Sequence, residues 1–427
     1  MKYNLSKNKT NFYILSLSFI FFLIINLIYF TLNLNVELNV YAFNELFINY
    51  QAGFIRRGLL GEIFWQVHNK FSVDPKVFFS FFFLIIYLAQ ILLFFSLFKR
   101  YIVSKTIFIL IMLSPSFLLF HIYSPDLYFL KDSIIKFVFI LHAYIFYIYF
   151  FIKKDKEMYL KYLKFLIIPI LFAVILTHEY QVFSLSLHFL ISIGTSNRKE
   201  DIKKIFIYYS PLILPVLLVI LFMGNQTQFE NLNNILKVFN VELNDYLGGG
   251  VYKYIGSFYK WHFFYFSYDD FLSLFLSFIL SALIIYILFQ YFIEKKIITF
   301  QSKYQNRYLL YFLPVLIPFL LTSDHGRNLA FLSFYLISFY LILNLNQVQF
   351  IRQVNTIYKN ILVKNLIFIF IFFFIFMWKL DQFAGFELQG KPNGIFKSSL
   401  FAEFIKLIKF LYIYIDINII DLPEIKL

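Results

Sequence analysis

Long apolar runs separated by short polar segments set the pattern of this chain. The runs occupy 12–30, 77–98, 106–122, 133–152, 162–177, 180–195, 205–223, 271–293, 308–322, 328–345 and 363–378. Each is near the roughly 20 residues that an α-helix needs to cross the hydrocarbon core of a bilayer. We therefore predict an all-α polytopic membrane protein, with residues 1–427 forming a single integral membrane domain of 11–12 transmembrane helices. The candidate for the twelfth helix lies in 395–427, where Glu403, Lys406 and Lys409 recur at roughly helical spacing. This segment is either a twelfth span or an interfacial amphipathic helix.

The composition agrees with lipid as the solvent. The chain is 61% hydrophobic and 23% aromatic, with a mean hydropathy of +0.73, which is more apolar surface than a soluble core of this length could bury. It contains no cysteine, which excludes disulfides, thiol catalysis and cysteine-ligated metals. The first apolar run follows a basic start and lacks a small-residue cleavage site, so we interpret it as a retained span. The many Phe, Ile, Asn, Lys and Tyr residues suggest an AT-rich bacterial genome.

The charges of successive loops predict the orientation. One alternating set of loops, which begins with the N-terminal tail, holds 22 Lys and Arg and 5 Asp and Glu, whereas the other set holds 13 and 15. Cytoplasmic loops are the ones enriched in Lys and Arg, so we expect a multi-pass protein of the bacterial cytoplasmic (inner) membrane with its N-terminus in the cytoplasm. The same bias explains the net charge of +14 without nucleic acid as a partner. An alternative is one long helix over 165–194, which would invert all later spans; the strongly basic segments on both sides favour a hairpin.

In this topology the unusual polar segments all fall on the extracytoplasmic face. The first is "GFIRRGLLGE" in the outer loop 31–76, where Arg56 and Arg57 stand among three glycines. The pair could extend from an interfacial helix to lipid headgroups. It could also clamp a phosphate or pyrophosphate, since a guanidinium suits bidentate phosphate contacts and glycine permits close approach.

Three further segments carry candidate chemistry. "SDHGRN" contains Asp324 and Arg327, which either pair with each other in a turn or orient and bind an anionic substrate. "THEYQ" contains His178 and Glu179, which are candidate general bases if they lie in a partly dry pocket and are otherwise part of a hairpin turn. "SPDLYFLKDS" contributes Lys131, either to an anion site or to a solvated loop.

The outer loop 224–270 is long and aromatic. It contains "GGG" at 248–250, followed by Tyr252, Tyr259 and Trp261 among other aromatic residues. Such residues form belts at membrane interfaces. They could also be a platform on which sugar rings stack, with the glycines as a hinge.

A lipid-linked glycan would suit arginines, a base and aromatic residues on the outer face, where no nucleotide sugars are available. The layout of "GFIRRGLLGE", "SDHGRN" and the 224–270 loop resembles the bacterial O-antigen and capsule repeat-unit polymerases and the related ligases. The resemblance implies transfer of an undecaprenyl-pyrophosphate-linked glycan onto another lipid-linked unit, without a metal, alongside other polysaccharide-assembly membrane proteins. In it, Arg56, Arg57 and Arg327 would bind the phosphates. The chain departs from that layout because its largest outer loop follows the seventh span.

Two alternatives stay open. The chain also resembles the polyprenyl-phosphate-sugar-dependent glycosyltransferases of the membrane-embedded C fold, which carry an acidic residue in the first outer loop beside interfacial helices. Glu37, Glu45 or Glu62 could serve there, and Mg²⁺ could then be a cofactor. A flippase or transporter of lipid-linked glycans is the second alternative, although few charges fall at mid-depth in the predicted spans, where coupled transporters usually need them.

Overall fold

The structure is a computed structural model, and every description below concerns a defined part of the chain. It describes residues 19–28, 30, 40–98, 114, 117–118, 120–121, 128–194, 199–222, 224–239, 241, 275, 278–279, 282, 308–321 and 325–343. This part is all-helical and contains no strand. Four of its helices are long and apolar enough to cross a membrane, at Pro75–Leu97, Asp132–Phe150, Lys156–Thr177 and Lys199–Leu221. The prediction of an all-helical membrane protein is thus confirmed, while the full number of spans stays a prediction.

The helices follow the apolar runs closely. The elements are α2 (Val40–Glu45), α3 (Leu59–Phe71), α4 (Pro75–Phe98), α6 (Asp132–Phe146), η2 (Tyr147–Ile152), α7 (Lys156–Tyr162), η3 (Leu163–Ile167), α8 (Ile168–Thr177), α9 (Gln181–Ile193), α10 (Lys199–Tyr209), η4 (Ser210–Leu212), α11 (Ile213–Leu221), α12 (Gln226–Leu236), η5 (Lys237–Phe239), α15 (Tyr308–Leu321) and α16 (His325–Leu343). The π-helical segment η3 joins α7 to α8, and the 3₁₀ turn η4 joins α10 to α11. Each joined set forms one continuous membrane-length helix.

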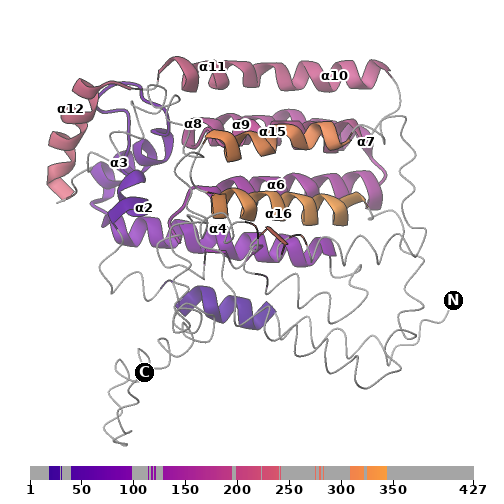
Figure 1. Cartoon of the computed structure of the whole chain (residues 1–427), viewed down its shortest axis with the longest axis horizontal. Coiled ribbons are helices and arrows are strands. Elements are labelled where there is room, and N and C mark those ends of the chain that lie inside the picture. Colours follow the sequence, from indigo (N-terminus) through magenta and orange to yellow (C-terminus); the bar gives the residue numbers. More distant parts are fainter. Residues whose placement is uncertain are drawn as a thin grey trace, which may run out of the picture.

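The long helices lie parallel and antiparallel in one bundle (Figure 1). Helix α6 packs against α4, α9 and α16, and α15 packs against α9 and α16. The bundle core is aromatic and aliphatic, with Phe83, Phe139 and Phe334 fully buried. Large apolar side chains also point outward, including Ile85, Phe165 and Leu221, which are 62%, 66% and 70% exposed. Such faces are stable in contact with hydrocarbon but not with water.

The segment "THEYQ" forms a tight hairpin. Helix α8 ends at Thr177, the backbone of His178 is extended, and α9 begins at Gln181. The two helices then contact each other along the bundle. The predicted hairpin is therefore correct and the single long helix over 165–194 is wrong. The starts of α4, α6, α9 and α16 lie at one end of the bundle, on the left in Figure 1.

The sequence-based spans agree less well in one place. The described residues within 106–122 are non-helical: Phe117, Leu118, Phe120 and His121 lie in turns. A proline precedes them at position 115, and proline lacks the N–H needed inside a helix. The helical prediction for 106–122 is therefore not confirmed at these positions. The predicted spans 271–293 and 363–378 and the segment 395–427 lie outside the described residues, apart from isolated positions in the first.

Candidate functional site

The described parts of several predicted outer loops meet at one end of the bundle. The short helices α2, α3 and α12 gather there, beside the ends of α8 and α11 and the starts of α6 and α9 (Figure 1). Segments that are far apart in the sequence supply polar and charged side chains to this end. We call this group the end cluster, and its members are Glu45, Arg57, Lys131, Asp132, His178, Glu179 and Arg327. The side of the membrane that it faces stays a prediction from loop charges.

Arg57 is one centre of the end cluster. Its Nε donates to Glu179 Oε1 and Oε2 at 2.9 and 2.7 Å, its Nη2 also contacts Glu179, and its Nη1 donates to Glu45 at 2.7 Å. The Arg57 backbone has φ 67°, a left-handed conformation that is uncommon for residues other than glycine. The backbone of Arg57 is therefore strained, and two carboxylates from other segments of the chain hold its guanidinium in place.

The glycines around Arg57 allow tight packing of the chain on itself. A Cβ on Gly61 would lie 2.1 Å from the carbonyl oxygen of Ile48, and one on Gly58 would lie 2.3 Å from the Tyr50 ring. Both positions therefore accept only glycine without rearrangement. In the described structure these glycines admit neighbouring protein segments, and no ligand is needed to explain them.

Arg327 is the second centre. Its Nε and Nη2 donate to the two Asp132 carboxylate oxygens at 2.5 and 2.9 Å, and Nη2 lies 2.8 Å from His178 Nε2. Because a guanidinium only donates hydrogen bonds, His178 Nε2 accepts here. The guanidinium carbon also lies 4.8 Å from the centre of the Tyr180 ring. Arg327 thus joins α16 to the start of α6 and to the α8–α9 turn.

Lys131 and His178 connect these two centres, since Lys131 is the chain neighbour of Asp132 and His178 is the chain neighbour of Glu179. Lys131 Nζ donates to the backbone carbonyls of Glu45 and Arg57 at 3.1 and 3.0 Å. His178 Nδ1 lies 3.6 Å from Glu179 Oε2. Three polar segments predicted from the sequence, "GFIRRGLLGE", "THEYQ" and "SPDLYFLKDS", and the arginine of "SDHGRN" therefore form one continuous network.

Burial and mutual contact set the protonation states of the network. Burial by itself would raise the pKa of Glu45, but Arg57 and Lys131 lower it to about 2. Burial likewise opposes ionisation of Glu179, and Arg57 nevertheless holds its pKa well below the usual range. Burial lowers the pKa of His178 to about 4 and that of Lys131 to about 8. At neutral pH both glutamates are therefore ionised, His178 is neutral, and Lys131 is near its own titration point.

Positive charge is in excess in this region. The network and its buried neighbours Arg56 and Lys136 contain five described cations, which are Arg56, Arg57, Lys131, Lys136 and Arg327, and three described carboxylates, which are Glu45, Asp132 and Glu179. With His178 neutral, the surplus is two positive charges. Buried charge without compensation is expensive, so these described side chains taken by themselves would be stabilised by an additional anion.

The structure brings together some of the sequence candidates and leaves others undescribed. Arg57, Lys131, His178, Glu179 and Arg327 share the network described above. Arg56 is buried, and its backbone N–H donates to the Phe222 carbonyl at 2.9 Å. The predicted partner Asp324 and the predicted sugar platform of Tyr252, Tyr259 and Trp261 lie outside the described residues.

Among the described residues, the carboxylate that pairs with Arg327 is Asp132, a pairing that the sequence did not indicate. The buried Lys136 on α6 was assigned no role at all, because it stands alone in an apolar run. Its spacing of four residues from Asp132 was the available signal, since such residues lie on one helix face. Among the described residues, no group of three His, Asp or Glu side chains is arranged to hold a metal ion.

Comparison with other proteins adds no relative. No protein-family model, curated protein or solved structure matches this chain. The fold and the end cluster define it as a helical membrane protein with a buried, positively charged network at one end. Its function has to be argued from that network.

Proposed function

We propose that this protein is a membrane transferase that uses polyprenyl-phosphate- or polyprenyl-pyrophosphate-linked saccharides at the end cluster. The observation that supports this most is the surplus of two positive charges among side chains from α6, α16 and the polar loops. A phosphate or pyrophosphate would supply the missing negative charge, and guanidinium groups suit it because they donate two parallel hydrogen bonds. The outward apolar side chains of the neighbouring helices α4 and α15, such as Ile85 and Leu310, suit a polyprenyl tail.

The network also offers the two functions that glycosyl transfer needs. Arg57, Arg327 and Lys131 would stabilise the negative charge that develops on the departing phosphate. A base would accept the proton of the acceptor hydroxyl. Neutral His178 is suited to this when Arg327 is drawn away from its Nε2, and the glutamates 45 and 179 are the other acceptors in reach of the cluster.

Within this class, the position of Glu45 favours transfer of a single sugar over polymerisation of whole repeat units. Glu45 ends the short helix α2 in the first polar loop, is 3% exposed, and pairs with Arg57. An acidic residue in the first outer loop, beside short helices, is the arrangement expected for the C-fold resemblance. Repeat-unit polymerisation stays the alternative within the same substrate class.

The experiment that tests this proposal is analysis of surface glycans in a strain that lacks the gene. We expect glycans with a shortened or missing repeat unit, restored by wild type but not by Arg57→Gln. Glu157→Gln, on the exposed start of α7 at the opposite end of the bundle, is the matched control and should restore them. Loss of long chains with single repeat units retained would instead assign polymerisation, and an unchanged glycan profile would refute the proposal.

A second candidate function, transport of a lipid-linked glycan, is favoured by polar groups deep in the bundle. His142 Nδ1 and His188 Nδ1 are 2.9 Å apart, and a chain of hydrogen bonds continues from His142 to the Tyr159 hydroxyl, Ser192 and the Tyr209 hydroxyl. The two histidines are fully buried. Polar residues at this depth occur along substrate and proton paths of transporters, and they also join helices as interhelical hydrogen bonds. Transport would be supported by lipid-linked glycan that accumulates on the cytoplasmic side in the deletion strain.

A further inference from the structure

Lys136 is a buried cation for which the proposed chemistry has so far given no use. It is 7% exposed and lies within the membrane-length helix Asp132–Phe150. Its Nζ lies 5.1, 5.3 and 5.8 Å from the ring centres of Phe120, Phe331 and Phe334. No carboxylate among the described residues lies within ion-pair distance of it. The aromatic faces attract the ammonium group, and Asp132 acts on it electrostatically from beyond ion-pair distance.

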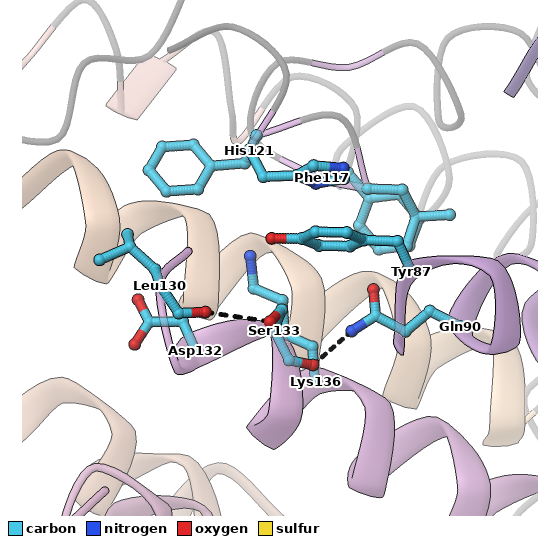
Figure 2. Close-up of a pocket in the computed structure, with 10 residues that line it drawn as sticks. Tyr87, Gln90, Phe117, His121, Leu130, Asp132, Ser133 and Lys136 are labelled. Carbon is cyan, nitrogen blue, oxygen red and sulfur yellow. Dashed lines mark hydrogen bonds between the residues drawn. The ribbon is translucent and has the colours of Figure 1, made fainter. Parts of the chain in front are cut away.

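The nearest carboxylate in the sequence is on the same helix. Asp132 precedes Lys136 by four residues, so the two side chains leave α6 on one face, about 6 Å apart along the axis. Both line a cavity of about 20 Å³ together with Gln90, His121 and Ser133. Figure 2 shows Lys136, Ser133 and Asp132 along one side of this cavity and the stacked rings of Tyr87 and His121 on the other. Polar and apolar side chains line the cavity together, and it is large enough for one water molecule, so a carboxylate that turned toward Lys136 would have room for one water beside it.

We infer that Asp132 exchanges partners when the anionic headgroup binds: it leaves Arg327 and pairs with Lys136. This inference rests on the proposed function, because the incoming group is the phosphate or pyrophosphate of the lipid-linked substrate. In the described structure Arg327 is neutralised by Asp132, so a phosphate that approached Arg327 would meet a carboxylate of its own sign. Lys136 gives that carboxylate a second site one helical turn deeper.

The exchange makes use of the charge surplus. Before binding, Lys136 lies buried with no described carboxylate in ion-pair contact, which costs free energy. After binding, Asp132 compensates Lys136 and the headgroup compensates Arg327, so both of these buried cations have an anionic partner. Arg327 also leaves His178 Nε2 as it moves to the headgroup, and this nitrogen becomes available to accept a proton. Lys136 is thus a positioning residue that acts through Asp132 and contacts no substrate.

The test combines binding and stability measurements on the purified full chain in detergent. The probe is farnesyl diphosphate, a short polyprenyl diphosphate, with inorganic pyrophosphate measured in parallel, and both are titrated by calorimetry. The variant is Lys136→Met, which keeps the length of the side chain and removes the charge. The matched control is Lys164→Met, because Lys164 also lies over two aromatic rings, at 4.9 and 5.7 Å, but on an exposed face.

We expect Lys136→Met to weaken farnesyl diphosphate binding by about tenfold or more, with its melting temperature equal to or above that of wild type. These opposite effects follow because the variant removes an uncompensated buried charge from the unbound state and the new partner of Asp132 from the bound state. Lys164→Met should change neither quantity.

Equal affinity of Lys136→Met and wild type would overturn the partner exchange and leave the proposed function standing. Weaker binding together with a lower melting temperature would also overturn it, because Lys136 would then support the fold. No binding by wild type would refute the proposed function itself. Equally tight binding of inorganic pyrophosphate would assign the site to a soluble phosphate and not to a lipid headgroup.

Discussion

The buried pair of Asp132 and Arg327 offers the sharpest test of the network as a structural unit. The perturbation is Arg327→Met, which removes the guanidinium and preserves an apolar side chain of similar reach. The two partners are 3% and 5% exposed and share two hydrogen bonds of 2.5 and 2.9 Å. With Arg327 gone, the Asp132 carboxylate stays buried, and breaking such a pair typically costs about 3–5 kcal/mol.

The position of Lys136 reduces the loss of stability that we expect. Lys136 lies one turn away on the same helix face and can compensate part of the stranded charge, so we expect a loss near the lower end, about 3 kcal/mol. The double variant Asp132→Leu with Arg327→Met removes both charges and fills the space with apolar groups. Replacing a whole buried pair in this way is often neutral or stabilising, so the double variant should recover most of the loss.

The assay is reversible unfolding of the purified protein in mixed micelles, for wild type, both single variants and the double variant. The thermodynamic cycle gives the coupling energy between the two side chains, and we expect at least about 2 kcal/mol for a buried charged pair. If Arg327→Met is as stable as wild type, or if the two single changes are additive, then Asp132 and Arg327 do not form the pair described here.

The remaining predictions concern packing, pH dependence and topology. Gly61→Ala should lower the unfolding free energy by about 1–3 kcal/mol, as overpacking does, because its Cβ would meet the Ile48 carbonyl; unchanged stability would refute that packing. Farnesyl diphosphate affinity should fall as the pH rises through about 8, where Lys131 loses its proton, and Lys131→Met should remove this pH step. The chain has no cysteine, so single Asn234→Cys and Glu157→Cys variants can be labelled with a membrane-impermeant maleimide. Intact cells should label the first and not the second.

The helices themselves were largely predictable from the sequence. Apolar runs such as 77–98 became continuous helices because a membrane-length segment satisfies its backbone groups only by forming a helix. The hairpin between α8 and α9 followed from the basic segments on both sides of it. In contrast, the described residues at 117–121 form turns although they are mostly apolar, and they follow Pro115, which lacks the N–H needed inside a helix.

The site was predictable as a set of segments but not as a set of pairs. Isolated charges beside apolar runs indicated which loops mattered, since such charges need partners. They did not indicate that Arg327 would pair with Asp132, a residue 195 positions away. Pairing of this kind depends on how α6 and α16 pack, which is a property of the tertiary structure. Lys136 was missed for a different reason, because it stands alone in an apolar run.

The sequence did not show what the glycines of "GFIRRGLLGE" make room for. In "GFIRRGLLGE" they suggested that a ligand approaches the backbone closely. In the structure Gly58 and Gly61 permit close approach of the chain itself, to Tyr50 and to the carbonyl of Ile48. A sequence shows that space is needed beside a glycine, but the molecule that fills the space is known only from the fold.

The most direct test of the central claim is native mass spectrometry of the purified protein with undecaprenyl phosphate. The competitor is phosphatidylglycerol, which also carries a phosphate and acyl chains but has a single negative charge and no polyprenyl tail. We predict one tightly held undecaprenyl phosphate per chain in the presence of excess phosphatidylglycerol, and its loss in the Arg57→Gln variant. Equal retention of both lipids, or retention that is unchanged in Arg57→Gln, would contradict the assignment of the end cluster as a site for polyprenyl phosphates.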